Sequence, residues 1–224
     1  MRYEKGHRAE TAARIVGNAS TRIREGGIES IKVAELMKMA GLTHGGFYLH
    51  FKSRRDLINK AFAQAMEESV DRWRRIAERS VPGKRLSSIV AFYLAQRHLA
   101  DVGNGCALPA LSGDVSRSGA AIRRSFAAGF TEMVSILAED MRFCSSKEAR
   151  REAIEVASGM VGALLLARAV DDAGLAEEIL RIGREAVLSR ASSRSCAAGK
   201  AQLDASAKAE PSGAKSASRG SKPK

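Results

Sequence analysis

Residues 31–58 read IKVAELMKMAGLTHGGFYLHFKSRRDLI, and this pattern predicts two short helices joined by a tight turn at Gly41. Apolar side chains recur at helical spacing on both sides of that glycine, whose backbone freedom permits the turn. We expect one small core here, to which Ile23 of a preceding helix also contributes. Its other members are Val33, Leu36, Met37, Ala40, Leu42, Phe47 and Phe51. The second helix keeps a slim, polar outer face, which suits the major groove of DNA.

The glycine pair Gly45-Gly46 lies inside this second helix. A glycine in a helix costs roughly 1 kcal/mol relative to alanine, so the pair needs a reason. One reason is a close approach of the backbone to DNA, and the other is a poorly formed turn in place of a helix. We favour DNA because the neighbouring positions are well patterned. Cations flank the segment where phosphates would run, and they are Lys32, Lys38, Lys52, Arg54 and Arg55.

Helix signals continue outward on both sides, without convincing strand alternation or an internal repeat. The predicted helices span 7–25, 33–40, 43–50, 53–79, 84–100, 118–141, 147–170 and 175–189, with a short segment around 106–111. Ser53 and Ser145 have the spacing of capping boxes. The sequence therefore predicts an all-α fold, in which a long helix joins an N-terminal three-helix unit to a larger helical domain.

Charge divides the 224 residues into three parts, with a formal net charge of +12 in all. Residues 1–55 hold 11 Lys and Arg against 5 Asp and Glu, residues 56–189 hold 18 of each, and residues 190–224 hold 8 against 2. A basic end on a neutral body is typical of polyanion binding, with solvated surface charge as the alternative. We predict a DNA-binding domain at 1–55, a helical domain at 56–189 and a disordered basic tail at 190–224, which has too few apolar residues to fold.

Several other classes of protein lack support in the sequence. Cys106, Cys144 and Cys196 are widely spaced and odd in number, so neither a disulfide framework nor a CxxC metal site is expected. The four histidines lack metal-ligand spacing, and no nucleophile elbow, phosphate-binding loop or dinucleotide fingerprint is present. We expect no catalysis, metal or cofactor. Without a signal peptide or a membrane-length apolar stretch, we expect a cytoplasmic protein with no membrane partner.

The run AGLTHGGFYLHFKS at residues 40–53 resembles the helix-turn-helix of the TetR/AcrR family, and the likeness extends over roughly residues 8–60. The family pattern is Ala-Gly-Val/Leu-Ser/Thr, three variable positions, an apolar residue, Tyr-x-His/Tyr-Phe and a cap rich in Lys and Ser. The resemblance implies a homodimeric transcriptional regulator, most often a repressor. A small molecule or a thiol modification would release it from a pseudo-palindromic double-stranded operator.

The resemblance also implies where DNA contacts lie. Positions that commonly contact phosphate correspond to Thr43, Tyr48, His50 and Arg54, and variable base-reading positions to Thr43, His44 and Gly45, with Gly46 also facing the groove. Lys32 stands where the family often has Thr or Ser, which removes a helix cap, although its ammonium can still reach a phosphate, as can that of Lys52. The alternatives are a structural, half-buried Tyr48 and a His50 that only closes the turn.

Beyond residue 60 the likeness is one of layout. The segment GCALPAL at 105–111 resembles a Gly-Cys-x-Leu stretch of one branch, in which some members sense electrophiles or oxidants through a cysteine. A reactive Cys106 needs a lowered pKa, which Arg97, His98 or a helix start could supply; the alternative is a small buried hydrophobe. A small, largely apolar effector is expected among side chains that could equally be plain core: Trp73, Tyr93, Phe126, Phe130, Met133, Met160 and Leu164.

Dimerisation is expected through the last two helices, as in the family. Small residues on helix 147–170 permit a close helix approach, and apolar residues follow on the next helix. The set is Ala157, Ser158, Gly159, Gly162, Ala163, Leu175, Ile179 and Ile182. Ordinary packing within one chain is the alternative. The rival function is a nonspecific or architectural nucleic-acid-binding protein that uses its basic tail.

Overall fold

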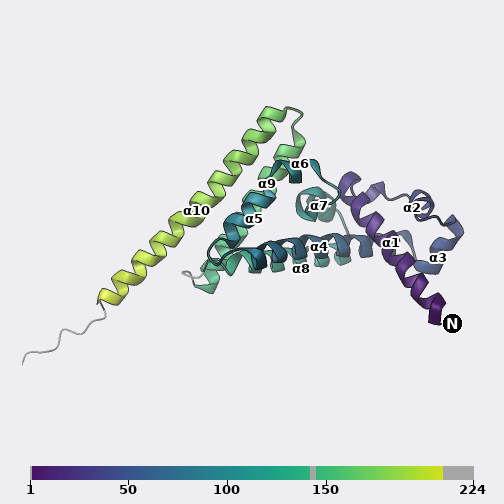
Figure 1. Ribbon diagram of the computed structural model, residues 1–224, viewed down its shortest axis with the longest axis horizontal. Helices are drawn as coiled ribbons and strands as arrows, with labels where there is room; N and C mark the ends of the chain where they lie inside the picture. Colours follow the sequence, from purple (N-terminus) through teal and green to yellow (C-terminus); the bar gives the residue numbers. More distant parts are fainter. Residues whose placement is uncertain (1, 142–144, 209–224) are drawn as a thin grey trace, which may run out of the picture.

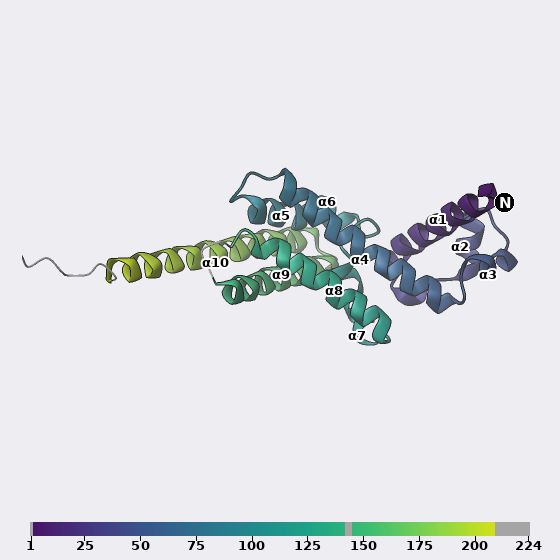
Figure 2. The ribbon, with the colours of Figure 1, turned by 90° about the horizontal axis from the view of Figure 1, so that it is seen from below.

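The computed structural model describes residues 2–141 and 145–208, and this part of the chain is helical with no strand (Figure 1). At one end lie α1 (Arg2–Gly26), α2 (Val33–Met39) and α3 (Phe47–His50), with single 3-10 turns at Ile28–Ser30 and His44–Gly46. Figure 2 shows the far end of α10 at the opposite extreme of the molecule. The predicted all-α class and N-terminal helix-turn-helix are confirmed.

The small core predicted around the turn is present. Ile23, Leu36, Met37, Phe47 and Phe51 are each at most 2% exposed. Ala40 is also buried, while Val33 and Leu42 are partly buried against the same core. Gly41 has a positive φ of 71°, which a residue with a side chain rarely adopts. The apolar spacing therefore predicts which face of each short helix turns inward.

The long helix α4 (Arg54–Arg79) is shared by both parts of the molecule. Ser53 caps it, since the Ser53 hydroxyl accepts from the Asp56 amide at 3.1 Å and the Asp56 carboxylate accepts from the Lys52 amide at 3.1 Å. Its buried face runs from Leu57 to Ala77, packing on α1 near its start and on α8 and α5 further along. Any tilt of α4 therefore moves the N-terminal helices.

The remaining helices are α5 (Arg85–Tyr93), α6 (Gln96–Ala100), α7 (Ala107–Ser116), α8 (Ala120–Ala138), α9 (Ser146–Ala169) and α10 (Ala173–Lys208). The single helix predicted at 84–100 is broken at Leu94 and Ala95. Side chains take over the carbonyls there: the His98 ring donates to Tyr93 O at 2.7 Å and Arg184 donates to Leu94 O at 2.7 Å. The capping box at Ser145 is present, with Glu148 as its partner.

The last helix is longer than the sequence predicts. We expected it to end at Ser189, whereas α10 continues to Lys208. The added residues are rich in alanine, the strongest helix former, and no proline lies between Ser189 and Pro211. Residues 209–224, Cys144 and the side chain of Cys196 lie outside the described part of the protein, so the predictions about them are not tested.

Candidate nucleic-acid interface

The segment from Thr43 to His50 presents one bare, exposed face. The Gly46 amide donates to Thr43 O at 3.1 Å, which forms a 3-10 turn that leads into α3. Phe47 and Phe51 are buried with their rings 5.4 Å apart, so they anchor the segment from behind. Thr43, Gly45 and Tyr48, all predicted DNA contacts, lie exposed.

Nothing within the protein requires a glycine at position 45. Its φ is not positive, and a Cβ built on it would meet nothing within 4 Å. A Cβ on Gly46 would make only ordinary contacts of 3.7 Å with Met37 Cε and Thr43 Oγ1. Neither glycine is therefore required by backbone conformation or by packing, which supports a requirement outside the chain.

The other predicted contacts are less uniform. His50 is half-buried, and its buried Nδ1 has no hydrogen-bond partner among the described residues. Lys32 is 72% exposed and pairs with Glu35 at 3.1 Å. It occupies the N-cap of α2 without a side-chain cap bond, as expected. Lys52 is exposed, and the side chain of His44 lies outside the described part.

Arg54 is engaged within the domain. Its Nε donates to Ile31 O at 2.9 Å, and its Nη2 lies 3.0 Å from the Glu29 carboxylate. The side chain is still 40% exposed. Its first role in the free protein is thus to fasten the start of α4 to the segment before α2, which motif spacing alone does not reveal.

Two arginines and one leucine contribute to this surface, although the sequence pattern did not predict them. Arg8 donates to Leu49 O, and Arg14 donates to Ala40 O at 3.0 Å, so α1 holds the carbonyl ends of both α2 and α3. Leu49 itself is 62% exposed beside Tyr48, which is 70% exposed. No local pattern marks the arginines, because their partners lie 41 and 26 residues away.

A buried polar cluster lies around Cys106 in the other part of the molecule. The Cys106 amide donates to His98 Nε2 at 2.9 Å, and the Ala107 amide donates to Ser69 Oγ at 3.0 Å. His98 is therefore neutral with its proton on Nδ1, and burial lowers its pKa from 6.5 to about 4. Burial also raises the pKa of the Cys106 thiol, which faces the phenol of Tyr93.

This environment is opposite to the one that a reactive cysteine needs. His98 carries no positive charge, and Arg97 lies over the Phe92 ring at 4.4 Å. Cys106 is 3% exposed, which matches the alternative of a small buried hydrophobe. In the described conformation the thiol is shielded and protonated at neutral pH.

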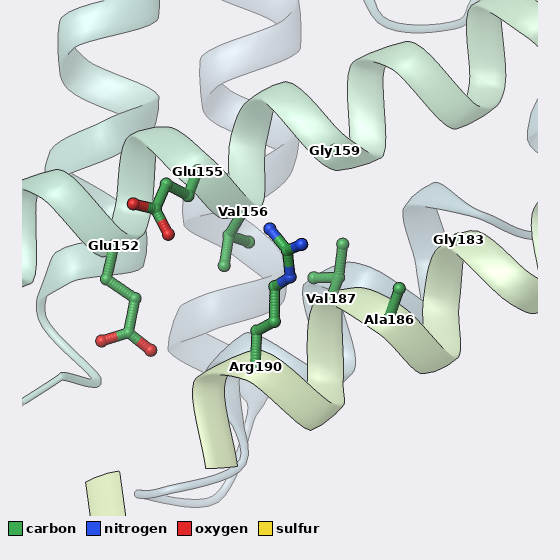
Figure 3. Close-up of a pocket in the computed structure, with 8 residues that line it drawn as sticks. All are labelled: Glu152, Glu155, Val156, Gly159, Gly183, Ala186, Val187 and Arg190. Atoms are coloured by element: carbon green, nitrogen blue, oxygen red, sulfur yellow. The ribbon is translucent and has the colours of Figure 1, made fainter. Parts of the chain in front are cut away.

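The predicted effector contacts divide into buried and partly buried side chains. Trp73, Tyr93, Met133, Met160 and Leu164 are buried, whereas Phe126 and Phe130 are partly buried and stack at 6.3 Å. Two hollows of the molecule are lined by other residues: one lies between α4 and α8, and the other between α9 and α10. Figure 3 shows the second, with Val156 and Gly159 on α9 facing Val187 and Gly183 on α10.

A buried arginine joins the two parts of the chain. Arg24 of α1 donates from Nε to Gly103 O at 2.6 Å and from Nη2 to the Glu68 carboxylate of α4 at 2.7 Å. Nearby, Asp114 of α7 accepts from the Ile28 amide at 3.0 Å. The loop between α6 and α7 is thus bonded to the end of α1, and the last turn of α7 is bonded to the 3-10 turn that follows α1.

The small residues of α9 differ in what surrounds them. A Cβ on Gly159 would lie 3.1 Å from Val187, and one on Gly183 would lie 2.7 Å from Ala163, so these positions let α9 and α10 pack closely within one chain. A Cβ on Gly162 would meet nothing within 4 Å. The alternative of intramolecular packing therefore applies to Gly159 and Ala163.

Two classes of site find no support in the described residues. No helix there is long and apolar enough to cross a membrane. The same residues contain no group of three or more His, Cys, Asp or Glu side chains that could hold a metal ion.

The comparisons with known proteins agree with this fold. Residues 15–61 match the family model of bacterial regulatory proteins, tetR family. A TetR-family transcriptional regulator from Agrobacterium tumefaciens is 22% identical, with a TM-score of 0.66 over 80% of this chain and 97% of that one. One from Cytophaga hutchinsonii is 14% identical, with a TM-score of 0.70 over 82% and 96%. The reduced form of Escherichia coli NemR is 18% identical, with a TM-score of 0.65 over 80% and 95%.

No curated relative matches the chain. These three structural likenesses are under 25% identity, so they concern the fold, while the match at 15–61 covers the helix-turn-helix itself. Together with the motif at residues 40–53, they show a tetR-type helix-turn-helix at residues 15–61 in a chain that has the fold of TetR-family transcriptional regulators.

Proposed function

We propose that the protein is a homodimeric repressor that acts in the cytoplasm on a pseudo-palindromic operator and is released by a small molecule. The observation that carries this proposal is the bare outer face of the segment from Thr43 to Leu49. It is anchored from behind by Phe47 and Phe51, and its Gly45 is open to solvent for no internal reason. Exposed Lys38, Lys52 and Arg55 supply the charge for phosphates.

Exposed apolar side chains on the last two helices support a dimer. Ile154, Leu165 and Leu166 on α9 are 36%, 46% and 59% exposed, and Leu175 and Ile182 on α10 are 45% and 48% exposed. Burying them against the same surface of a second chain would form a four-helix interface. Such a dimer would place two recognition helices about 34 Å apart, in successive major grooves.

Release requires an effector that prefers a DNA-incompetent conformation. A small, largely apolar effector would have to open a space beside the aromatic core, because Trp73 and Tyr93 are both buried. The segment that leads from this core, His98 to Cys106, contacts Arg24 of α1 through Gly103 O. An effector that displaced this segment would therefore loosen the DNA-binding helices without touching them.

Thiol modification is the other route to release. It would first require Cys106 to leave its buried position, because a protonated, shielded thiol reacts slowly. The structure thus favours noncovalent release over direct attack on this cysteine.

The test is selection of bound DNA from a random duplex pool, using the full chain at near-physiological salt. We expect a single inverted repeat, bound roughly 10³-fold or more above bulk DNA. A Tyr48→Phe, Thr43→Ala double variant should recover the repeat poorly at equal protein concentration. Recovery of no motif would overturn the repressor and leave the nonspecific nucleic-acid-binding protein, which uses its basic tail, as the better description.

A further inference from the structure

The exposed face of α3 carries a large apolar side chain that the folded protein does not use. Leu49 is 62% exposed on α3, and the exposed Gly45 lies in the 3-10 turn that leads into this helix. The side chain adds nothing to the core, whose members at this place are Phe47 and Phe51. A partner that covered this side chain would gain its apolar contact area.

The backbone at Leu49 is held firmly from both sides. Phe47 and Phe51, two residues before and after, are each 2% exposed, and Arg8 donates to the Leu49 carbonyl. The side chain is therefore presented from a fixed position. Because this backbone is already ordered, a contact at Leu49 would cost only the ordering of the side chain itself.

The charge around Leu49 indicates what covers it. Lys38, Lys52 and Arg55 are exposed in the same domain, and residues 1–55 hold 11 Lys and Arg against 5 Asp and Glu. Exposed cations in the same domain as an exposed apolar side chain suit the major groove, where phosphates border the base edges. Within that groove, the apolar group is the C5-methyl of thymine.

We propose that Leu49 reads a thymine in each operator half-site by packing on its C5-methyl group. This inference rests on the proposed operator binding and adds one specificity residue to it. The glycines at 45 and 46 bring the backbone close, and Leu49 fills the space in front of a thymine that a cytosine or a purine would leave without a methyl partner.

The experiment replaces thymine by deoxyuridine, one position at a time, in the inverted repeat recovered by selection. This change deletes the methyl group and leaves base pairing intact. We expect one symmetric position at which the full chain binds about fourfold more weakly for each half-site changed, and about fifteenfold for both, the effect of one buried methyl group. Affinity is measured by fluorescence anisotropy at fixed salt.

The matched variants are Leu49→Ala and Val81→Ala. Leu49→Ala should bind the thymine operator more weakly and lose its discrimination against deoxyuridine, while its thermal midpoint stays unchanged because the side chain is exposed. Val81 is 69% exposed outside the DNA-binding domain, so Val81→Ala should keep the full discrimination.

The outcomes distinguish a failure of the thymine contact from a failure of the proposed repressor function. A repeat without a deoxyuridine-sensitive position, or a Leu49→Ala variant that keeps the sensitivity, would overturn the thymine contact alone. A pool that yields no repeat would overturn the repressor and this contact together.

Discussion

Replacing Gly45 by alanine should stabilise the protein while weakening its binding to DNA. The added Cβ would meet nothing within 4 Å in the free protein, and the φ at Gly45 is not positive. Alanine also restricts the unfolded chain more than glycine does. We expect a gain of about 0.5–1 kcal/mol in the free energy of unfolding, which raises the thermal midpoint by roughly 1–4 °C in a chain of this size.

The loss of affinity comes from space that the methyl group would take from DNA. Overpacking a closely fitted contact costs about 1–3 kcal/mol, which corresponds to binding roughly 5- to 150-fold weaker. The assay pairs thermal unfolding with anisotropy titration on the selected operator at one salt concentration. Opposite signs for stability and affinity are the signature of a residue kept for its partner.

Gly113 is a matched control, because it is also helical and exposed, and a Cβ there would meet only Arg117 Nη2 at 4.0 Å. Gly113→Ala should raise stability by a similar amount and leave operator affinity unchanged. If Gly45→Ala binds the operator as tightly as the unaltered chain, the close approach of the backbone is refuted. If it melts at a lower temperature, the open surroundings assigned to Gly45 are wrong.

Four further predictions concern the rest of the molecule. Arg24→Leu should lower the free energy of unfolding by about 2–4 kcal/mol in urea titrations, since it leaves Gly103 O and Glu68 without their arginine partner. The control Arg22→Ala removes a 50% exposed arginine from an ion pair and should cost under about 1 kcal/mol. Equal losses in the two variants would contradict the buried bridge. Ile182→Glu should convert the proposed dimer to monomer in sedimentation equilibrium, and a dimer that persists would exclude this face of α10. The pKa of His98 in the folded protein is about 4, below its ordinary value of 6.5, so the unfolded chain binds more protons between these pH values. Stability should therefore fall by at most about 3 kcal/mol as the pH drops from about 6.5 to 4. The loss should be smaller in His98→Gln, and identical pH slopes for the two proteins would refute the assignment. Cys106 should be alkylated by iodoacetamide at pH 7.5 at least about 100-fold more slowly in the native than in the urea-unfolded chain, followed by peptide mass spectrometry, and comparable rates would show an exposed thiol.

The helix-turn-helix could be predicted from the sequence because its determinants are local. Apolar spacing, the turn at Gly41 and the cap at Ser53 all act within a few residues, so the short helices and their buried faces follow from the pattern alone. The same reasoning identified an exposed Thr43, Gly45 and Tyr48. It gave Leu49 no role, because a leucine in an amphipathic pattern is ordinarily assigned to a core.

Contacts between distant segments decide the features that the sequence could not supply. The break after Tyr93 depends on Arg184, 90 residues away from its partner Leu94, and the bridge at Arg24 depends on Gly103, 79 residues away. The pKa of Cys106 depends on burial, which a local sequence with a basic neighbour does not reveal. In each case the residue type was visible and its partner was not.

The hydrogen bonds of Arg24 also indicate how large a change in operator affinity regulation can produce. Arg24 is held by Gly103 O on the loop and by Glu68 on α4, while Asp114 holds the Ile28 amide, so α1 follows both the long helix and the loop. A hydrogen bond to a charged group contributes about 1.5–3 kcal/mol. Loss of one such bond in the effector-bound conformation would change operator affinity by roughly 10- to 150-fold if α1 is positioned only in the DNA-competent state. That range is the size of a typical allosteric coupling, so under the proposed function a displacement of this loop alone would be enough to weaken operator binding.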